Sequence, residues 1–162
     1  MIRKLILATL IMTPVLATAN TSQLPSAPYL PLELATRAAQ TALHTCAAQG
    51  HAVSVAVVTR DGATKVLLKA DNSGPHTTDS AQGKAFTSAA MGRDTAGLAE
   101  FIAAKPANAG LRDMDARMVI QAGGLPVKMG GALLAGIGVG GAPSGDIDAA
   151  CAAAGLKEIG AE

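Results

Sequence analysis

The chain has 162 residues, the length of one ordinary domain, and its 13 basic and 12 acidic residues leave a formal net charge of +1. Hydrophobic residues make up 49% of the chain and aromatic residues only 2%, which excludes intrinsic disorder and predicts a core of small and aliphatic side chains. Because the charge is nearly balanced and the basic residues are not clustered, the sequence also argues against nucleic acid as a partner.

Residues 1–19 have the pattern of an export signal. Two basic residues precede an apolar run, and Ala17 and Ala19 supply the small residues that signal peptidase requires. The rival interpretation is a membrane anchor, but the run is interrupted by Pro14 and is shorter than the ~20 residues that span a bilayer. We therefore expect a cleaved signal, an exported protein of the periplasm or the extracellular space, and no stable membrane span after cleavage.

Residues 20–29 are polar and contain two prolines, which predicts a flexible leader, and residues 30–162 then form a single domain. Its first helix begins near Pro31, whose missing N–H costs nothing in a first turn, and ends at Gly50. His44 falls on the solvent face of this helix. The apolar face repeats at intervals of three and four residues: Leu32, Ala35, Ala39, Leu43 and Cys46.

Two β-branched and apolar runs, residues 53–58 and 65–69, flank a glycine-containing loop and predict a hairpin. A polar loop then leads into a helix that begins near Thr78 or Asp79, both good N-cap residues. A stripe of very small residues lets this helix lie close to a sheet or to another helix: Ala81, Ala85, Ser88, Ala89 and Gly92.

The next helix is expected over residues 95–104, with a loop at residues 106–110. Three short strands, residues 118–122, 126–129 and 133–139, are separated by pairs of glycines and predict a three-stranded meander. Neighbouring strands joined by tight turns make a mainly antiparallel sheet. The order of elements therefore predicts an α+β sandwich, in which helices flank the sheet.

The last predicted helix runs from Ser144 to Ala154, with Ser144 as its cap and Gly155 as its stop. Asp146 and Asp148 complement the positive end of the helix dipole. The predicted buried face consists of Ile147, Ala150, Cys151 and Ala154. Cys46 and Cys151 both lie on apolar faces of terminal helices, and we predict a disulfide between them because export leads to an oxidising compartment.

Several motifs have ordinary structural explanations. The glycine-rich stretch of residues 123–146 lacks the Lys-Ser/Thr pair of a phosphate-binding loop, and Gly136, Gly138 and Gly140 alternate with apolar residues as in a strand. Close packing and tight turns explain these glycines better than nucleotide binding does. No nucleophile and base form a recognisable motif, so the residues give no direct support for catalysis.

The three histidines are candidate ligands of a metal ion or a cofactor. His44 is expected to be exposed, and His51 lies between a helix end and a strand, where a structural cap is as reasonable as a ligand. His76 lies in a polar loop that leads directly into a helix N-terminus, a common position for functional groups. For His76 the residues alone leave a ligand and an ordinary loop histidine equally open.

A further signal lies in four segments: VSVAVVTRDG, GPHTTDSAQGKAFTSAAMGRDT, GGLPV and GIGVGGAPSGDIDAACAAAGL. Together they resemble, in the same order, the GlcG/HbpS-like haem-binding family, a domain also found at the C-terminus of some corrinoid adenosyltransferases. The resemblance covers residues 30–156. It implies a five-stranded, mainly antiparallel sheet flanked by helices in a profilin-like α/β sandwich, and assembly into symmetric homo-oligomers, often octamers.

For function, the resemblance implies an exported protein that binds haem for scavenging, delivery or sensing, without catalysis. One alternative is a small-molecule enzyme or accessory subunit acting on a hydroxy acid, with His76 and Lys84 as polar groups of its site. Another is a purely structural oligomer. The family's Gly-Pro-His-Thr loop corresponds to His76 and Thr77, and its Lys-Ala helix motif corresponds to Lys84 and Ala85.

Haem requires an axial donor, apolar walls and partners for its two propionates. We predict His76 as the ligand of haem iron, with Thr77, Lys84, Arg93 and His51 as further cofactor-binding residues. Apolar walls are expected from Phe86, Met91, Met114 and Met118. The expected propionate partners are Lys84, Arg93, Arg112 and Arg117. Because a domain rich in alanine and glycine leaves little internal room, we expect haem in a surface cleft or between subunits.

Overall fold

The computed structural model describes residues 26–162 of the chain. The predicted export signal, residues 1–19, and the first part of the predicted leader lie outside the described residues. Residues 26–29 are exposed and have no regular structure, and Leu30 is the first buried residue. No helix in this described part is both long and apolar enough to cross a membrane.

An antiparallel sheet of four strands, in the order β2-β1-β4-β3, forms the centre of the described domain. β1 (Ser54–Thr59) and β2 (Thr64–Lys69) form the predicted hairpin. β3 (Gly124–Met129) and β4 (Ala132–Gly140) form a second hairpin. Because β1 pairs with β4 in the middle of the sheet, segments far apart in the sequence share one core.

The prediction of five strands was wrong, since residues 26–162 contain four. Residues 118–122 have no regular strand and run along α2 (Thr77–Met91) instead of along a neighbouring strand. The backbone N–H of Val119 donates to the hydroxyl of Thr87 at 2.9 Å and lies 3.4 Å from the carbonyl oxygen of Gly83. Because α2 supplies these partners, the segment forms no ladder with a strand.

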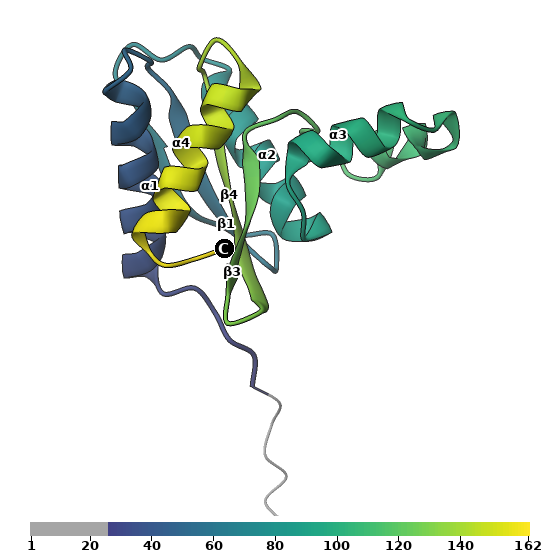
Figure 1. The fold of residues 1–162 in the computed structure, drawn as a ribbon, viewed down its shortest axis with the longest axis horizontal. Coiled ribbons are helices and arrows are strands. Elements are labelled where there is room, and N and C mark those ends of the chain that lie inside the picture. Colours follow the sequence, from purple (N-terminus) through teal and green to yellow (C-terminus); the bar gives the residue numbers. More distant parts are fainter. Residues whose placement is uncertain (1–25) are drawn as a thin grey trace, which may run out of the picture.

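Helices cover both faces of the sheet (Figure 1). α1 (Leu32–Ala47) and α4 (Gly145–Glu158) lie side by side on one face, and α2 lies against the other. α3 (Thr95–Ala103) and the short 3-10 helix η1 (Pro106–Asp113), which replaces a predicted loop, project away from the sheet on the side of α2. This arrangement confirms the predicted α+β class.

The alternation of side chains along β1 divides the interior into two cores. Val55 and Val57 face α1 and α4, whereas Ala56 faces α2. The second core is packed through very small residues: a Cβ added to Gly138 would lie 2.2 Å from the carbonyl oxygen of Ala81. The glycines of β4 and the small residues of α2 therefore meet directly, and this contact brings the helix backbone close to the sheet.

The predicted disulfide between Cys46 and Cys151 joins the two terminal helices, with a Cα–Cα distance of 5.6 Å. The rest of the buried face of α1 differs in part from the prediction. Leu32 is 59% exposed, and Ala38 and Ala42 are buried in its place. The smaller side chains face inward because α4 lies close against this side of α1.

The buried face of α4 is rotated from the predicted one. Ile147 is partly buried against the core as predicted, whereas Ala150 is exposed and Ala154 is only partly buried. The buried residues are Asp148, Cys151, Ala152, Gly155 and Leu156. Gly155 does not end the helix, which continues to Glu158. Its missing side chain lets α4 approach α1, where a Cβ would lie 2.3 Å from the carbonyl oxygen of Ala38.

Candidate functional site

The candidate site surrounds the first turns of α2. His76 precedes the helix, and Ser80 and Lys84 follow at intervals of four residues. This spacing places the three side chains along one side of the helix. All three line a cavity of about 310 Å³, whose opposite wall comes from residues 141–145 and from α4. The spacing of four residues is a sequence signal from which this grouping was predictable.

His76 is exposed and has a ring that is available to a ligand. Its imidazole makes no hydrogen bond with any residue between 26 and 162, and its backbone carbonyl accepts from Ser80 at the start of α2. The ring lies over Gly74, where an added Cβ would be only 2.8 Å from the imidazole Cε1. Glycine at this position therefore leaves the space that the ring occupies.

Lys84 is buried beside the same cavity and has two partners. Its ammonium donates to a carboxylate oxygen of Asp148 at 2.8 Å and to the carbonyl oxygen of Val139 at 3.0 Å. The second carboxylate oxygen of Asp148 accepts from the backbone N–H of Ala142 at 3.0 Å. The ion pair thus connects α2, β4 and α4. From the sequence, Asp148 is expected only to complement the helix dipole, since no local pattern links it to Lys84.

Thr77, a predicted site residue, is buried beneath the loop that carries His76. Its hydroxyl lies 2.8 Å from the hydroxyl of Ser54 on β1 and donates to the carbonyl oxygen of Gly74, also at 2.8 Å. These bonds hold the start of α2 against the sheet. The structure therefore gives Thr77 the position of an anchor for the neighbouring His76.

His51 and Arg93 lie apart from the cavity that His76 lines. The backbone N–H of His51 donates to the carbonyl oxygen of Cys46 at 3.0 Å, just after the end of α1. The guanidinium of Arg93 donates to the carbonyl oxygen of Gly97 at 2.9 Å. It also lies 5.4 Å from the centre of the Phe101 ring.

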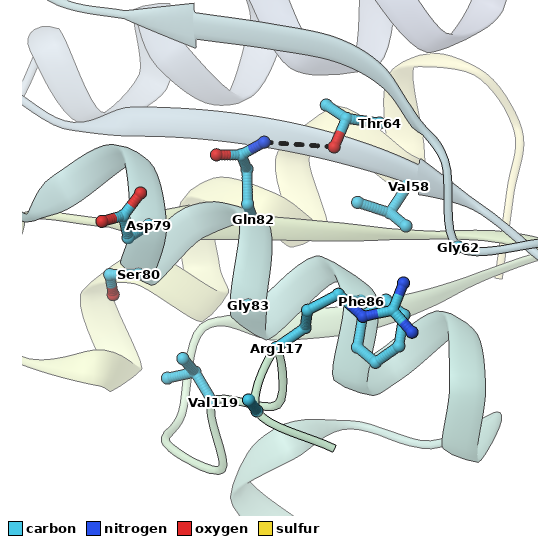
Figure 2. A pocket seen from close by; sticks show the side chains of 11 residues that line it. Val58, Gly62, Thr64, Asp79, Ser80, Gln82, Gly83, Phe86, Arg117 and Val119 are labelled. Atoms are coloured by element: carbon cyan, nitrogen blue, oxygen red, sulfur yellow. Dashed lines mark hydrogen bonds between the residues drawn. The ribbon is translucent and has the colours of Figure 1, made fainter.

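A larger cavity of about 430 Å³ lies between α2, the β1–β2 hairpin and residues 116–119 (Figure 2). Ser80 lines both cavities, so the two adjoin at the first turns of α2. Apolar side chains of Val58, Phe86 and Val119 contribute to its walls. Of the four residues predicted to form apolar walls, Phe86 lines this cavity. The other three, Met91, Met114 and Met118, line neither cavity.

Arg117 supplies the cationic group of this larger cavity. Its guanidinium lies 4.1 Å from the centre of the Phe86 ring and donates to a carboxylate oxygen of Asp115 at 2.6 Å. The side-chain and backbone hydrogen bonds from Arg117 lower the pKa of Asp115 to about 2. Arg112, also predicted to pair with a propionate, is exposed on η1 and lines neither cavity.

The family described as "Haem degrading protein HbpS-like" matches residues 30–157 of the chain. No curated protein matches the sequence significantly. The family match therefore covers almost all of the domain that the structure describes.

Solved structures share the same fold. A crystal structure of HbpS is 42% identical with a TM-score of 0.79, and the match covers 87% of this chain and 97% of that one. A double mutant of HbpS from Streptomyces reticuli is 43% identical with a TM-score of 0.78, over 91% and 97% of the two chains. The PduOC:heme complex is 22% identical with a TM-score of 0.77, over 83% and 98%, and shows a shared fold.

Proposed function

The chain belongs to the HbpS-like family, and from this we propose that it is an exported haem-binding protein that scavenges, delivers or senses haem without degrading it. One observation carries the proposal: the exposed imidazole of His76 lines a polar cavity, and this cavity adjoins a second one with apolar walls. A protein with the same fold has been solved as a heme complex, which adds support.

The groups that line the two adjoining cavities fit the chemistry of haem. Imidazole is a common axial ligand of haem iron, and the ring of His76 makes no hydrogen bond with the described residues. Phe86 and Val119 offer apolar surface, and the guanidinium of Arg117 suits a propionate. Bound haem would supply an iron centre that can exchange an electron or an axial ligand. Thr77 would hold His76 in position through its buried hydroxyl.

We further propose that the protein acts as a symmetric homo-oligomer outside the cytoplasm. α3 and η1 project from the domain, and the exposed side chains of Phe101 and Met114 lie on and beside them. Exposed apolar groups on a projecting segment favour contact with another copy of the chain. The disulfide between Cys46 and Cys151 supports an oxidising compartment.

Hemin titration of the purified mature protein tests the proposal. We expect a saturable, stoichiometric Soret shift, and we expect His76→Ala to weaken binding and to change the bound spectrum because an axial ligand is lost. His51→Ala is the matched control, since His51 lies at the end of α1, and should bind hemin as the wild type does. Loss of binding in His51→Ala or Thr77→Val, with His76→Ala unchanged, would move the site elsewhere.

The same titration tests whether the role is non-catalytic. After hemin is bound, a reductant is added in air and the Soret band is followed over time. We expect the band to keep its intensity apart from the change of oxidation state. Progressive loss of the band together with release of iron, absent from free hemin under the same conditions, would show degradation and would contradict the non-catalytic role.

A further inference from the structure

The polar cavity between α2 and α4 is lined by polar groups that have no role in holding haem iron at His76. Its volume is about 310 Å³, and most of the groups that line it are polar. Ser80 and Lys84 line it from α2, Ser144 and Asp148 from α4 and its cap, and Gln121 from the segment before β3. What such a cavity binds depends on which of these groups still lack a hydrogen-bond partner.

The carboxylate that lines the cavity, that of Asp148, already has hydrogen-bond partners. One carboxylate oxygen of Asp148 accepts from Lys84 and the other from the backbone N–H of Ala142. The hydroxyl oxygen of Ser144 accepts from the backbone N–H of Ile147 at 3.3 Å, as the cap of α4. The anionic acceptor of the cavity is therefore occupied, whereas the hydroxyl of Ser80 and the amide of Gln121 can each accept as well as donate.

The donors are not all occupied. The ammonium of Lys84 carries three protons, and residues 26–162 provide it with two acceptors, Val139 and Asp148. Lys84 is only 2% exposed and lines this cavity, so a molecule bound in the cavity could supply an acceptor for the third proton. In the same part of the chain, the side chains of Ser80 and Gln121 make no hydrogen bond with another residue.

The backbone adds positive potential at the same place. The N-termini of α2 and α4 both adjoin the cavity, through His76 at one helix and Ser144 at the other. The dipole of each helix concentrates partial positive charge at its N-terminus. Asp79 and Asp146 lie in the first turns of these helices, but both are exposed and neither lines this cavity.

We propose that this cavity binds the carboxylate of a small free organic acid, with Lys84, Ser80 and Gln121 as donors. An ionised carboxylate accepts hydrogen bonds and donates none, which matches a buried ammonium with a third proton to donate and a lining carboxylate that already has its partners. The site goes beyond haem binding, because it requires neither iron nor the imidazole of His76. A haem propionate carries the same chemical group, so the experiment has to separate the two sources.

Malonate is the probe, and malonamide is its neutral counterpart. The ¹⁵N-labelled mature protein, without haem, is titrated with each compound and followed by amide chemical shifts. We expect saturable shifts with malonate at residues 76–80 and 141–148, and no saturable shifts with malonamide. No saturable response to malonate at tens of millimolar, or an equal response to both compounds, would overturn the proposal.

Ser80→Ala tests the donor set without breaking the buried ion pair. We expect it to weaken malonate binding about tenfold, the effect of one hydrogen bond to a charged group. Thr78→Ala is the matched control, since it removes a hydroxyl from the same turn of α2 at a residue that does not line the cavity. Equal affinities for malonate in the two variants, both folded by their amide spectra, would overturn the assignment of Ser80.

Added hemin separates the two sources of the carboxylate. His76 lines the same cavity, so the macrocycle itself can hinder malonate, and hemin dimethyl ester, which has no free propionate, is the control. If the cavity serves a free acid, hemin and its dimethyl ester should change the malonate affinity equally. Displacement of malonate by hemin but not by the ester would assign the cavity to a propionate and would overturn the proposal of a free acid. The Soret titration reads haem binding separately, so failure of either proposal is visible without the other.

Discussion

The ammonium of Lys84 and a carboxylate oxygen of Asp148 lie 2.8 Å apart, with side chains that are only 2% and 3% exposed. The two residues are 64 positions apart in the sequence and belong to helices on opposite faces of the sheet. They meet beyond the end of β4, where the carbonyl oxygen of Val139 also accepts from Lys84. This ion pair forms one side of the polar cavity and fixes the distance between α2 and α4 there.

Breaking the ion pair is expected to destabilise the domain strongly. Lys84→Met or Asp148→Leu removes one partner and leaves the charge of the other buried and unpaired, at an expected loss of about 3–5 kcal/mol in the free energy of unfolding. Lys84→Met combined with Asp148→Leu should lose less than the sum of the single variants, because no charge remains buried. Urea unfolding measures all three, and single variants as stable as the wild type would contradict the expectation.

Loss of the disulfide is expected to lower stability without changing the fold. Replacing both Cys46 and Cys151 by serine removes a link across 105 residues, which should reduce the free energy of unfolding by about 2–5 kcal/mol. Urea unfolding and circular dichroism provide the two measurements. Titration of thiols in the unfolded, unreduced mature protein should detect none, and two reactive thiols would show that the link is absent.

Gly138→Ala should be among the most damaging small substitutions in the sheet. The new Cβ would meet the carbonyl oxygen of Ala81 at 2.2 Å, so α2 must move away from β4, at an expected cost of about 3 kcal/mol. Gly110→Ala is the control, because nothing lies within 4 Å of its added Cβ. Thermal unfolding should separate the two variants clearly, and equal melting temperatures would argue against the close contact.

The carboxyl group of Asp115 should titrate at about pH 2 in the folded protein. Because the folded-state pKa is lowered from 3.8, the pairing with Arg117 stabilises the fold above the ordinary pKa, and this contribution is lost as the pH falls toward 2. In Arg117→Met the pKa should rise toward 3.8, with the backbone N–H at position 117 still lowering it in part. Carboxyl ¹³C shifts against pH measure both values; an unchanged titration in the variant would exclude the guanidinium as the cause.

Assembly through the projecting segment is expected to depend on its apolar side chains. Phe101→Ser combined with Met114→Ser removes two exposed apolar groups, which are 45% and 62% exposed in the single chain. Multi-angle light scattering should show an oligomer for the wild type and a smaller particle for the double variant. Leu67→Ser on β2 serves as a control of similar exposure. A wild-type particle with the mass of one chain at micromolar concentration would contradict the proposal.

Several parts of the fold were predictable because their signals are local. Alternating apolar residues and a glycine-containing loop predicted the β1–β2 hairpin, and Ser144 was expected to cap α4, where it accepts from Ile147. The predicted small face of α2 does lie against the glycines of β4. These patterns involve residues that are close in the sequence, within one turn or one strand. They can therefore be interpreted without knowledge of the tertiary structure.

Only the tertiary structure decided which elements face one another. Residues 118–122 have the pattern of a strand, yet they pair with α2 because that helix offers hydrogen-bond partners where no strand is adjacent. Asp148 looked like a first-turn acid but turns inward, because a buried ammonium from α2 lies across from it. The family resemblance singled out His76 and Lys84, whereas the adjoining cavities depend on contacts between segments distant in sequence, which no local pattern contains.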